Sequence, residues 1–308
     1  MPDHISLKLL FIINPGSGKD NNIDYSAVIK DYFKAKPHTA DIFVLPDDYS
    51  SDGIKKKIAG SKADRVIAVG GDGTVKLVAE NLLGTGIPLG ILPAGSANGL
   101  ARELGIDTDP VKALHIIETG EQKKISLLKI NDILCIHLSD IGFNAYVVKK
   151  FELDKKRGMW TYIKAAWKVL RDYEKMEVNI TTDGNEIRRD AVMVVVANAT
   201  KYGTGIMINP AGDLEDDLFE VIVVRKISLT EIFKMRFTHK RFHPKRTELF
   251  QTRSLKIKSR HRVHFQVDGE YLGRIKSLSA TLLPGVLQVL TPAELNTKRS
   301  NELREKHR

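Results

Sequence analysis

One apolar run of this chain leads straight into a glycine-rich loop, and this junction restricts the local fold strongly. After residues 65–69 (Arg-Val-Ile-Ala-Val) come Gly70, Gly71, Asp72, Gly73 and Thr74. Residues 75–83 then show helical spacing. Glycines let a backbone approach a ligand closely, and a helix N-terminus presents free N–H groups to an anion. The unit predicts a phosphate site, and a tight turn without a ligand is the alternative.

Two further strand-like runs end in loops of small and polar residues. Residues 9–13 precede a loop that contains Asn14, Pro15, Gly16, Ser17 and Gly18, and residues 89–92 precede one that contains Gly95, Ser96 and Asn98. Because the carboxyl ends of parallel strands line one edge of a sheet, we expect the three loops to converge on one crevice. The first loop is not a P-loop, since Ile13 stands where that motif requires its first glycine.

The pattern of strands and helices changes near residue 123. Strand-like runs first alternate with helical stretches, which predicts a parallel α/β sheet; the strands are expected at 7–13, 41–45, 65–69 and 87–92 and the helices at 24–35, 51–60, 75–83, 97–104 and 110–119. Short β-rich segments then predominate and predict a β-sandwich, interrupted by helices at 159–173 and 229–238. We therefore predict domains at 1–123 and 124–292, with a tail at about 293–308 that packs back on the first domain.

Four motifs in order resemble those of the diacylglycerol kinase catalytic family, which includes bacterial soluble lipid kinases and sphingosine kinases. They are the three loops above and, downstream, Val267, Asp268, Gly269 and Glu270. The resemblance runs from about Leu7 to Pro292. It implies a doubly wound, NAD kinase-like ATP-binding domain followed by a β-sandwich. It also implies Mg²⁺-dependent transfer of the γ-phosphate of ATP to a hydroxyl of diacylglycerol, a related glycerolipid or a sphingoid base.

Candidate catalytic carboxylates flank Gly269. In an extended chain the side chains of Asp268 and Glu270 share one face. The resemblance implies that Glu270 accepts the proton of the acceptor hydroxyl or is the close partner of that base. It also implies that Asp268 and Asp72 lie in the charged network around the γ-phosphate. An ordinary Asp-Gly hairpin turn is the alternative interpretation.

An acidic cluster at residues 213–217 is a candidate metal site. Asp216 matches the aspartate with which the family holds a structural Mg²⁺, and we expect Asp213 and Leu218 to complete that site. Oxygen ligands suit this hard cation. Asp217 stands where the family has glycine, and a solvated acidic loop is the alternative.

Several positions depart from the family pattern. Lys76 and Leu77 replace an Asn-Glu pair, Gly99 stands where bacterial members carry aspartate, and Ser126 replaces a network aspartate. Fewer carboxylates predict weaker organisation of Mg²⁺ or a different substrate branch. The missing carboxylates are also compatible with an alternative function, that of a non-catalytic regulatory protein that binds lipid or nucleotide. An NAD kinase shares the Gly-Gly-Asp-Gly-Thr loop, but the 267–270 segment argues against it.

Positive charge is concentrated in one stretch. Residues 225–262 contain 13 Lys and Arg against two acidic residues, while the net charge of all 308 residues is +10. Such a stretch could attract an anionic membrane surface, and a solvated face is the alternative. The sequence shows no zinc-ligand spacing, helix-turn-helix signature or RNA-stacking motif, so we expect no nucleic-acid partner.

Apolar runs in this chain are too short to span a bilayer, and the N-terminal residues do not resemble a signal peptide. The single Cys135 cannot form an internal disulfide, and its apolar neighbours predict that its thiol is buried in the core. We therefore expect a cytoplasmic protein that binds the membrane peripherally. The oligomeric state stays open, a homodimer included.

Overall fold

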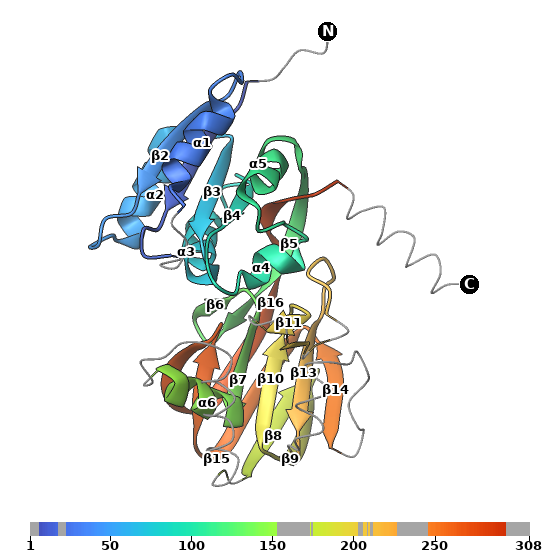
Figure 1. Cartoon of the computed structure of the whole chain (residues 1–308). Helices are drawn as coiled ribbons and strands as arrows, with labels where there is room; N and C mark the ends of the chain where they lie inside the picture. The colour runs from blue at the N-terminus through green and yellow to red at the C-terminus, as the bar shows by residue number, and fades with distance from the viewer. Residues whose placement is uncertain are drawn as a thin grey trace. The chain divides into compact units, whose positions relative to one another are not determined.

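The computed structural model describes residues 6–17, 23–152, 173, 175–202, 206–207, 209, 212–226 and 246–293. The chain forms two compact units: unit 1 comprises Met1–Ile125 with Gly285–Arg308, and unit 2 comprises Ser126–Pro284 (Figure 1). It passes between them inside strands β5 (Glu121–Ile130) and β16 (Glu270–Thr291). The sequence pattern placed residues 285–292 with the second domain. They belong to unit 1 because Val289 of β16 pairs with Leu89.

Unit 1 is built on a parallel sheet whose strand order is β2-β1-β3-β4, followed by the end of β16. The strands are β1 (Lys8–Ile13), β2 (Thr39–Val44), β3 (Arg65–Gly70) and β4 (Leu89–Pro93). The central strands β3 and β4 are buried almost throughout, as expected for parallel strands covered on both faces. The α/β class predicted for the N-terminal part is confirmed.

Five helices connect these strands: α1 (Tyr25–Phe33), α2 (Ser51–Ser61), α3 (Asp72–Leu82), α4 (Gly99–Glu103) and α5 (Pro110–Thr119). Three begin at residues whose side chains accept a backbone N–H of the first turn, namely Asp24, Ser50 and Asp109. Helix α3 begins at Asp72, three residues before the predicted start, so the glycine-rich motif itself forms the first turn of the helix.

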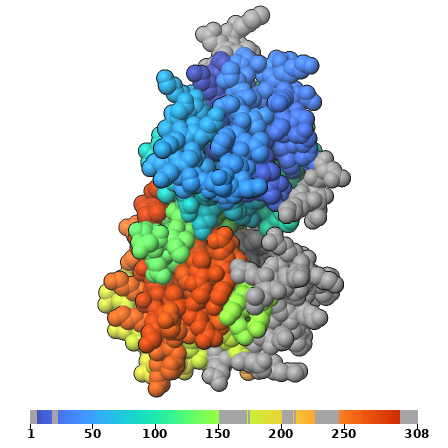
Figure 2. Space-filling model, turned by 90° about the vertical axis from the view of Figure 1, so that its left-hand side faces the viewer, coloured from blue at the N-terminus to red at the C-terminus, as the bar shows by residue number. Residues whose placement is uncertain are grey.

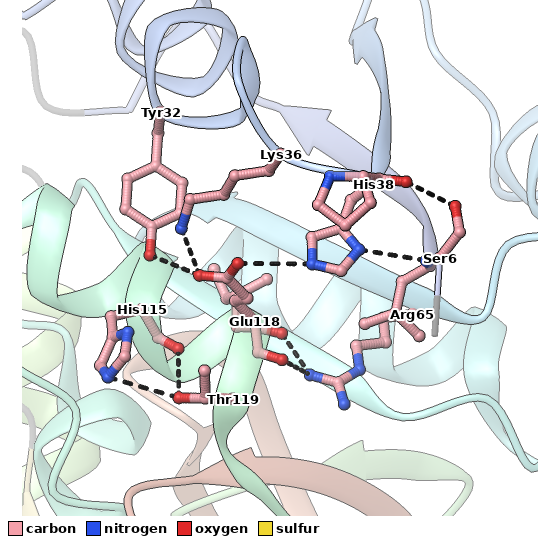
Figure 3. A network of polar contacts seen from close by, with 11 residues as sticks. Ser6, Tyr32, Lys36, His38, Arg65, His115, Glu118 and Thr119 are labelled. Atoms are coloured by element: carbon pink, nitrogen blue, oxygen red, sulfur yellow. Dashed lines mark hydrogen bonds and ion pairs between the residues drawn. The ribbon is translucent and has the colours of Figure 1, made fainter. Parts of the chain in front are cut away.

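A polar network centred on Glu118 joins several elements of unit 1 (Figure 3). The Glu118 carboxylate accepts hydrogen bonds from the Tyr32 hydroxyl (2.8 Å) and the Lys36 ammonium, and His38 Nε2 lies 3.3 Å away. Arg65 donates to the carbonyl oxygen of Glu118 (3.1 Å). Burial raises the pKa of the Glu118 carboxyl, but the bonds from Lys36 and Tyr32 outweigh burial and the net pKa is lowered. Arg65 is the first residue of β3. The network therefore holds the N-terminal end of this strand, and the glycine-rich loop follows its other end.

Unit 2 is an antiparallel β structure whose main sheet has the order β14-β13-β10-β7-β15-β16. Its strands are β6 (Ile133–Cys135), β7 (Leu138–Gly142), β8 (Met176–Thr182), β9 (Asn185–Ala191), β10 (Met193–Ala197), β11 (Lys201–Tyr202), β12 (Ile206–Met207), β13 (Phe219–Val224), β14 (Thr247–Thr252) and β15 (Ser254–Val267), with parts of β5 and β16. The predicted β-sandwich is confirmed. A core that includes Val194, Phe219, Ile257 and Phe265 fills it.

Strand β15 changes partners along its length. Residues 256–259 pair with β8, whereas residues 265–267 pair with β7. Between these stretches the register with β16 jumps from Lys258↔Ser277 to Val263↔Ile275, so several residues of β15 face a single residue of β16. Bulges of this kind bend a strand and redirect its side chains. Residues 259–262 therefore project from the corner where β15 leaves one partner strand for another.

Helix α6 (Phe143–Glu152) was not predicted from the sequence, and neither was strand β14. Phe143 and Val147 of α6 pack on buried residues of β7, β10 and β13 and form a second core cluster on that face of the sheet. The predicted helices at 159–173 and 229–238 and the tail at 293–308 lie outside the described residues, except for Tyr173 and Ala293. In the part of the chain that the structure describes, no helix is long and apolar enough to cross a membrane.

Candidate functional site

Residues 14–17, 70–74 and 94–98, here called the loop cluster, meet at the carboxyl ends of β1, β3 and β4. Asn14 Nδ2 donates to Thr74 Oγ1 over 3.2 Å, and the Ser17 and Thr74 hydroxyls also lie 3.2 Å apart. Thr74 is buried, so its hydroxyl joins the first two loops from within the unit. The convergence of the loops expected from the sequence is therefore present. All the residues predicted to bind nucleotide lie in the loop cluster except Gly18, which lies outside the described residues.

The second and third loops touch backbone to backbone at two glycines. A Cβ added at Gly95 would lie 2.5 Å from the Cα of Gly71, and one added at Gly71 would lie 3.2 Å from the Cα of Gly95. Real Cβ atoms do not tolerate the shorter distance to a backbone atom. These glycines are thus needed for the two loops to approach each other. The sequence predicted them only as positions where a ligand can approach the backbone.

Asp72 braces the third loop. Its carboxylate accepts hydrogen bonds from the backbone N–H groups of Gly99 (2.9 Å) and Leu100 (3.1 Å), at the start of α4. Asn98 closes the same loop on itself, since its side-chain amide exchanges two hydrogen bonds with the backbone of Gly95 (2.9 and 2.7 Å). The Asp72 carboxylate therefore holds the loop at 94–98 and α4 against the start of α3.

The N-terminus of α3 is the electropositive element of the loop cluster. Gly71 occupies the N-cap position and has no side chain with which to cap the first N–H groups of the helix. A cavity of about 370 Å³ lies in the same unit, lined by Asn14, Pro15 and Ser17 of the first loop, by Val69 just before the second and by Ala94 of the third. Ordinary ligand sites have volumes of about 300–1,000 Å³. The lining reaches Val69, the residue before the glycine-rich loop, but includes none of residues 70–74. The N-terminus of α3 by itself suits a phosphate-bearing ligand.

Asp268 and Gly269 form the turn of the hairpin between β15 and β16. Both have positive φ, 50° and 88°, and the flanking Val267 and Glu270 pair with each other. This is the geometry of a two-residue type I′ turn, so the alternative interpretation of the motif as an Asp-Gly hairpin describes its backbone correctly. The Asp268 carboxylate accepts the backbone N–H groups of Ile136 (3.1 Å) and His137 (2.9 Å) and so anchors the turn to the segment before β7.

Glu270 differs from the other two predicted catalytic carboxylates. It is exposed, at the first position of β16, and the described residues include no hydrogen-bond or ion-pair partner for its side chain. Asp72 and Asp268 are held by backbone N–H groups, whereas the Glu270 carboxylate is open to a reactant. Asp72 belongs to unit 1, and Asp268 and Glu270 belong to unit 2.

Asp213 and Asp216 lie in one tight turn ahead of β13. Asp216 Oδ1 accepts the N–H of Leu218 (3.1 Å), Asp213 Oδ1 accepts the N–H of Glu215 (3.0 Å), and the Ser126 hydroxyl donates to the carbonyl oxygen of Asp216 (3.0 Å). Within the described ranges, no three His, Cys, Asp or Glu side chains are grouped so as to hold a metal ion. The predicted Mg²⁺ site stays a prediction.

Sequence reasoning missed a buried carboxylate in β7. Asp140 Oδ2 accepts hydrogen bonds from the side-chain amides of Asn144 (2.5 Å) and Gln266, while no side chain of the described residues hydrogen-bonds to Oδ1. Burial raises the pKa of Asp140 to about 6. The available signal was an aspartate next to apolar residues in strand 138–142, all of whose residues are buried.

Comparison with known families agrees with this two-part architecture. The profile of the "Diacylglycerol kinase catalytic domain" matches residues 8–130, and that of the "YegS C-terminal NAD kinase beta sandwich-like domain" matches residues 140–291. The fold and the loop cluster define a kinase of the α/β-plus-sandwich class. The chain belongs to the diacylglycerol kinase catalytic family, a family of lipid kinases that phosphorylate an alcohol group.

Individual relatives cover most of the chain. A "Diacylglycerol kinase" of Mycobacterium tuberculosis is 29% identical over 74% of this chain and 77% of its own length. A "Probable lipid kinase YegS-like" of Chromohalobacter salexigens is 27% identical over 78% and 81%. The fold is shared with a putative diacylglycerol kinase from Bacillus anthracis str. Sterne (TM-score 0.72, 21% identity, 94% of this chain and 98% of that one). It is shared more distantly with an NAD kinase from Archaeoglobus fulgidus solved with ATP (TM-score 0.55, 13% identity, 97% and 99%).

Proposed function

We propose that this lipid kinase transfers the γ-phosphate of ATP to a hydroxyl of diacylglycerol or a closely related lipid, with Mg²⁺. The single observation that carries the ATP assignment is the loop cluster. Its glycines bring two loops into backbone contact, and the N-cap residue of α3, Gly71, has no side chain to cap the helix. This combination attracts phosphate through backbone N–H groups and the helix dipole. The lipid acceptor is supported by relatives named as diacylglycerol kinases.

Phosphoryl transfer requires positioning, charge neutralisation and a group that accepts the hydroxyl proton. We assign the third role to Glu270, because its carboxylate is the exposed member of the three predicted catalytic acids. The anchored Asp268 turn fixes the position of the Glu270 backbone. Asp213 and Asp216 offer oxygen ligands of the kind Mg²⁺ prefers and would hold the ion in unit 2. When bound, Mg²⁺ supplies charge neutralisation at phosphate oxygens.

A radiolabelled ATP assay tests this assignment. Purified protein is offered diacylglycerol, phosphatidylglycerol, a sphingoid base and NAD in parallel, and we expect label in a lipid product. Glu270→Gln should lower kcat by about 10²-fold or more and leave the KM for ATP nearly unchanged. Glu186→Gln is the matched control, since Glu186 is an exposed glutamate on β9 of the same unit.

Three outcomes would contradict the proposal. Label in NAD alone would indicate an NAD kinase, and label in none of the four acceptors would favour a non-catalytic binding protein. Full turnover by Glu270→Gln would remove this residue from the mechanism while leaving the lipid kinase itself intact.

We also propose that the protein works at an anionic membrane surface. The support is the charge of residues 225–262, which contain 13 basic residues and only two acidic ones. Each Lys or Arg near an anionic leaflet contributes about 1 kcal/mol of attraction. An acceptor hydroxyl carried by a membrane lipid requires the enzyme to remain at the interface during turnover.

A further inference from the structure

A second large cavity lies entirely within unit 2. It has a volume of about 720 Å³, and four of its lining side chains are permanently basic: Lys175, Arg260, Arg262 and Arg274. The cavity contains neither loop-cluster residues nor residues 268–270. It is therefore separate from the groups assigned above to nucleotide binding and catalysis.

The bulge in β15 creates this cavity. Residues 259–262 (Ser-Arg-His-Arg) are the extra residues at the corner of the strand, and all four line the cavity. A regular strand would direct alternate side chains to opposite faces, whereas a bulge can gather successive ones. Strands β15 and β16, orange to red in Figure 2, form much of the surface of unit 2 in that view.

Two of the arginines are held in place by hydrogen bonds. Arg262 donates from Nε (3.2 Å) and Nη2 (2.8 Å) to the carbonyl oxygen of Arg274. Arg274 Nη2 lies 3.1 Å from His264 Nε2 and donates to it. Guanidinium groups fixed in this way lose less conformational entropy when they bind an oxyanion, and their planar donor fork matches phosphate geometry.

His264 adds no charge of its own to the wall. Burial, together with Arg274, Lys149 and Lys150, lowers the pKa of His264 to about 4. Its ring is stacked on Tyr146 (centroids 4.4 Å apart, planes inclined by 13°), and its Nδ1 donates to the Tyr271 hydroxyl over 2.7 Å. The neutral imidazole thus serves as an acceptor that orients the Arg274 guanidinium.

Acidic side chains offset only part of the positive charge. The cavity contains Glu177 and the exposed Asp190. Glu177 already pairs with Arg188, outside the cavity lining, over 2.7 Å, and Arg260 is 4.0 Å from it. Among the described residues, the lining therefore has four permanently basic side chains and two carboxylates, and the Glu177 carboxylate already pairs with Arg188 outside the cavity. The cavity has an excess of positive charge that an anion can neutralise.

We propose that this cavity binds a phosphate group, the chemistry shared by an anionic lipid headgroup and a small phosphate metabolite. The fixed Arg262 and Arg274 would orient the oxyanion, and the exposed Arg260 and Lys175 would complete the charge. The tyrosines at 146 and 173, with Met176, give the cavity an apolar wall against which the carbon part of a headgroup can pack. The site is one that neither the kinase reaction nor the loop cluster requires.

Binding measurements on the full chain test the proposal. Calorimetry with glycerol 3-phosphate probes a soluble phosphate ester, and flotation with vesicles of phosphatidylglycerol in phosphatidylcholine probes a headgroup in a membrane. The main variant is Lys175→Gln/Arg260→Gln. Both residues are exposed, so the fold should persist. The control Lys129→Gln/Lys276→Gln removes the same number of positive charges from exposed positions outside both the cavity and the basic stretch 225–262.

We expect the main variant to weaken binding of at least one probe by about tenfold or more and the control to remain within about twofold of the wild type. Arg262→Lys keeps the charge but not the planar fork, so it should lose part of the affinity. Loss with glycerol 3-phosphate identifies a soluble ligand, and loss with vesicles alone identifies a lipid headgroup. Equal binding by wild type and main variant, or equal loss in the control, would overturn the proposal. These readouts do not depend on ATP or turnover.

Discussion

Asp140 shows what burial does to a single ionisable residue in this fold. Two side-chain amides hold one of its carboxylate oxygens, and in the part of the chain that the structure describes no side chain hydrogen-bonds to the other. Because burial raises its pKa to about 6, the folded protein retains a proton at pH values where the unfolded chain has lost it. Stability should therefore fall as the pH rises from about 4 to about 6, and the loss should persist at neutral pH.

Asp140→Asn should remove this pH dependence. Asparagine has the same shape and keeps an oxygen for the amides of Asn144 and Gln266, but it carries no charge to desolvate. We expect the variant to gain up to about 3 kcal/mol over the wild type at pH 7.5 and little at pH 4. Urea unfolding at both pH values measures the difference. A constant difference between the two proteins across this range would show that Asp140 is not the group responsible.

At the scale of elements, the loop cluster allows glycine positions to be ranked by what surrounds them. Gly95→Ala places a Cβ against backbone and should destabilise the protein by about 1–3 kcal/mol. Gly71→Ala meets a looser contact and should have a smaller effect. Gly73→Ala is the control, since nothing lies within 4 Å of the added atom and the position is inside α3, where alanine is favoured by about 1 kcal/mol.

Thermal unfolding and ATP calorimetry on the three glycine variants provide the measurement. Stability and ATP affinity should both fall most in Gly95→Ala and less in Gly71→Ala, whereas Gly73→Ala should keep or gain stability. If Gly71→Ala instead abolished ATP binding at unchanged stability, phosphate approach rather than loop packing would be the reason for that glycine.

Much of unit 1 follows from local signals. The buried run at 65–69 and the glycines after it predict a strand, a loop and a helix, and the rule that parallel strands share an edge predicts that the three loops meet. The start of α3 is misplaced because glycines are poor helix formers in isolation, while in the fold residues 72 and 73 already belong to the first turn.

Unit 2 depends more on contacts between distant residues. Helix α6 was missed because its ten residues, Phe143–Glu152, follow β7 directly, with only Gly142 at the junction. The bulge at 259–262 exists only in the pairing of β15 with β16, so no local pattern indicates it. Asp268 shows the reverse case. The Asp-Gly signal predicts the turn, but only the structure reveals that its carboxylate binds the backbone before β7.

At the scale of the whole molecule, the proposed binding to an anionic membrane predicts a dependence on charge. Co-sedimentation with vesicles should increase with the fraction of anionic lipid and decrease with added salt, because salt shortens the range of surface charge. Replacing Lys240, Arg241, Lys245 and Arg246 with glutamate should weaken vesicle binding and lipid phosphorylation while sparing a short-chain soluble acceptor. Binding that ignores both salt and these replacements would mean that the basic stretch is a solvated face. Retained binding of glycerol 3-phosphate by this variant would separate the effect from the phosphate cavity.

Unit 2 is inserted into unit 1, and the entry and exit of the chain are neighbours. A Cβ added at Gly285 would lie 3.7 Å from the Cβ of Lys124. For unit 1 alone, bringing these points together across the 159 residues of Ser126–Pro284 costs about 4.5 kcal/mol of loop-closure entropy. Once unit 2 has folded, its own contacts hold its ends, and the last strand of unit 1 reaches β4 as though it followed β5 directly in the chain. The connectivity therefore predicts an order of folding. If unit 2 folds first, β16 can pair with β4 as a segment that is close to β5, although the two are far apart in the sequence.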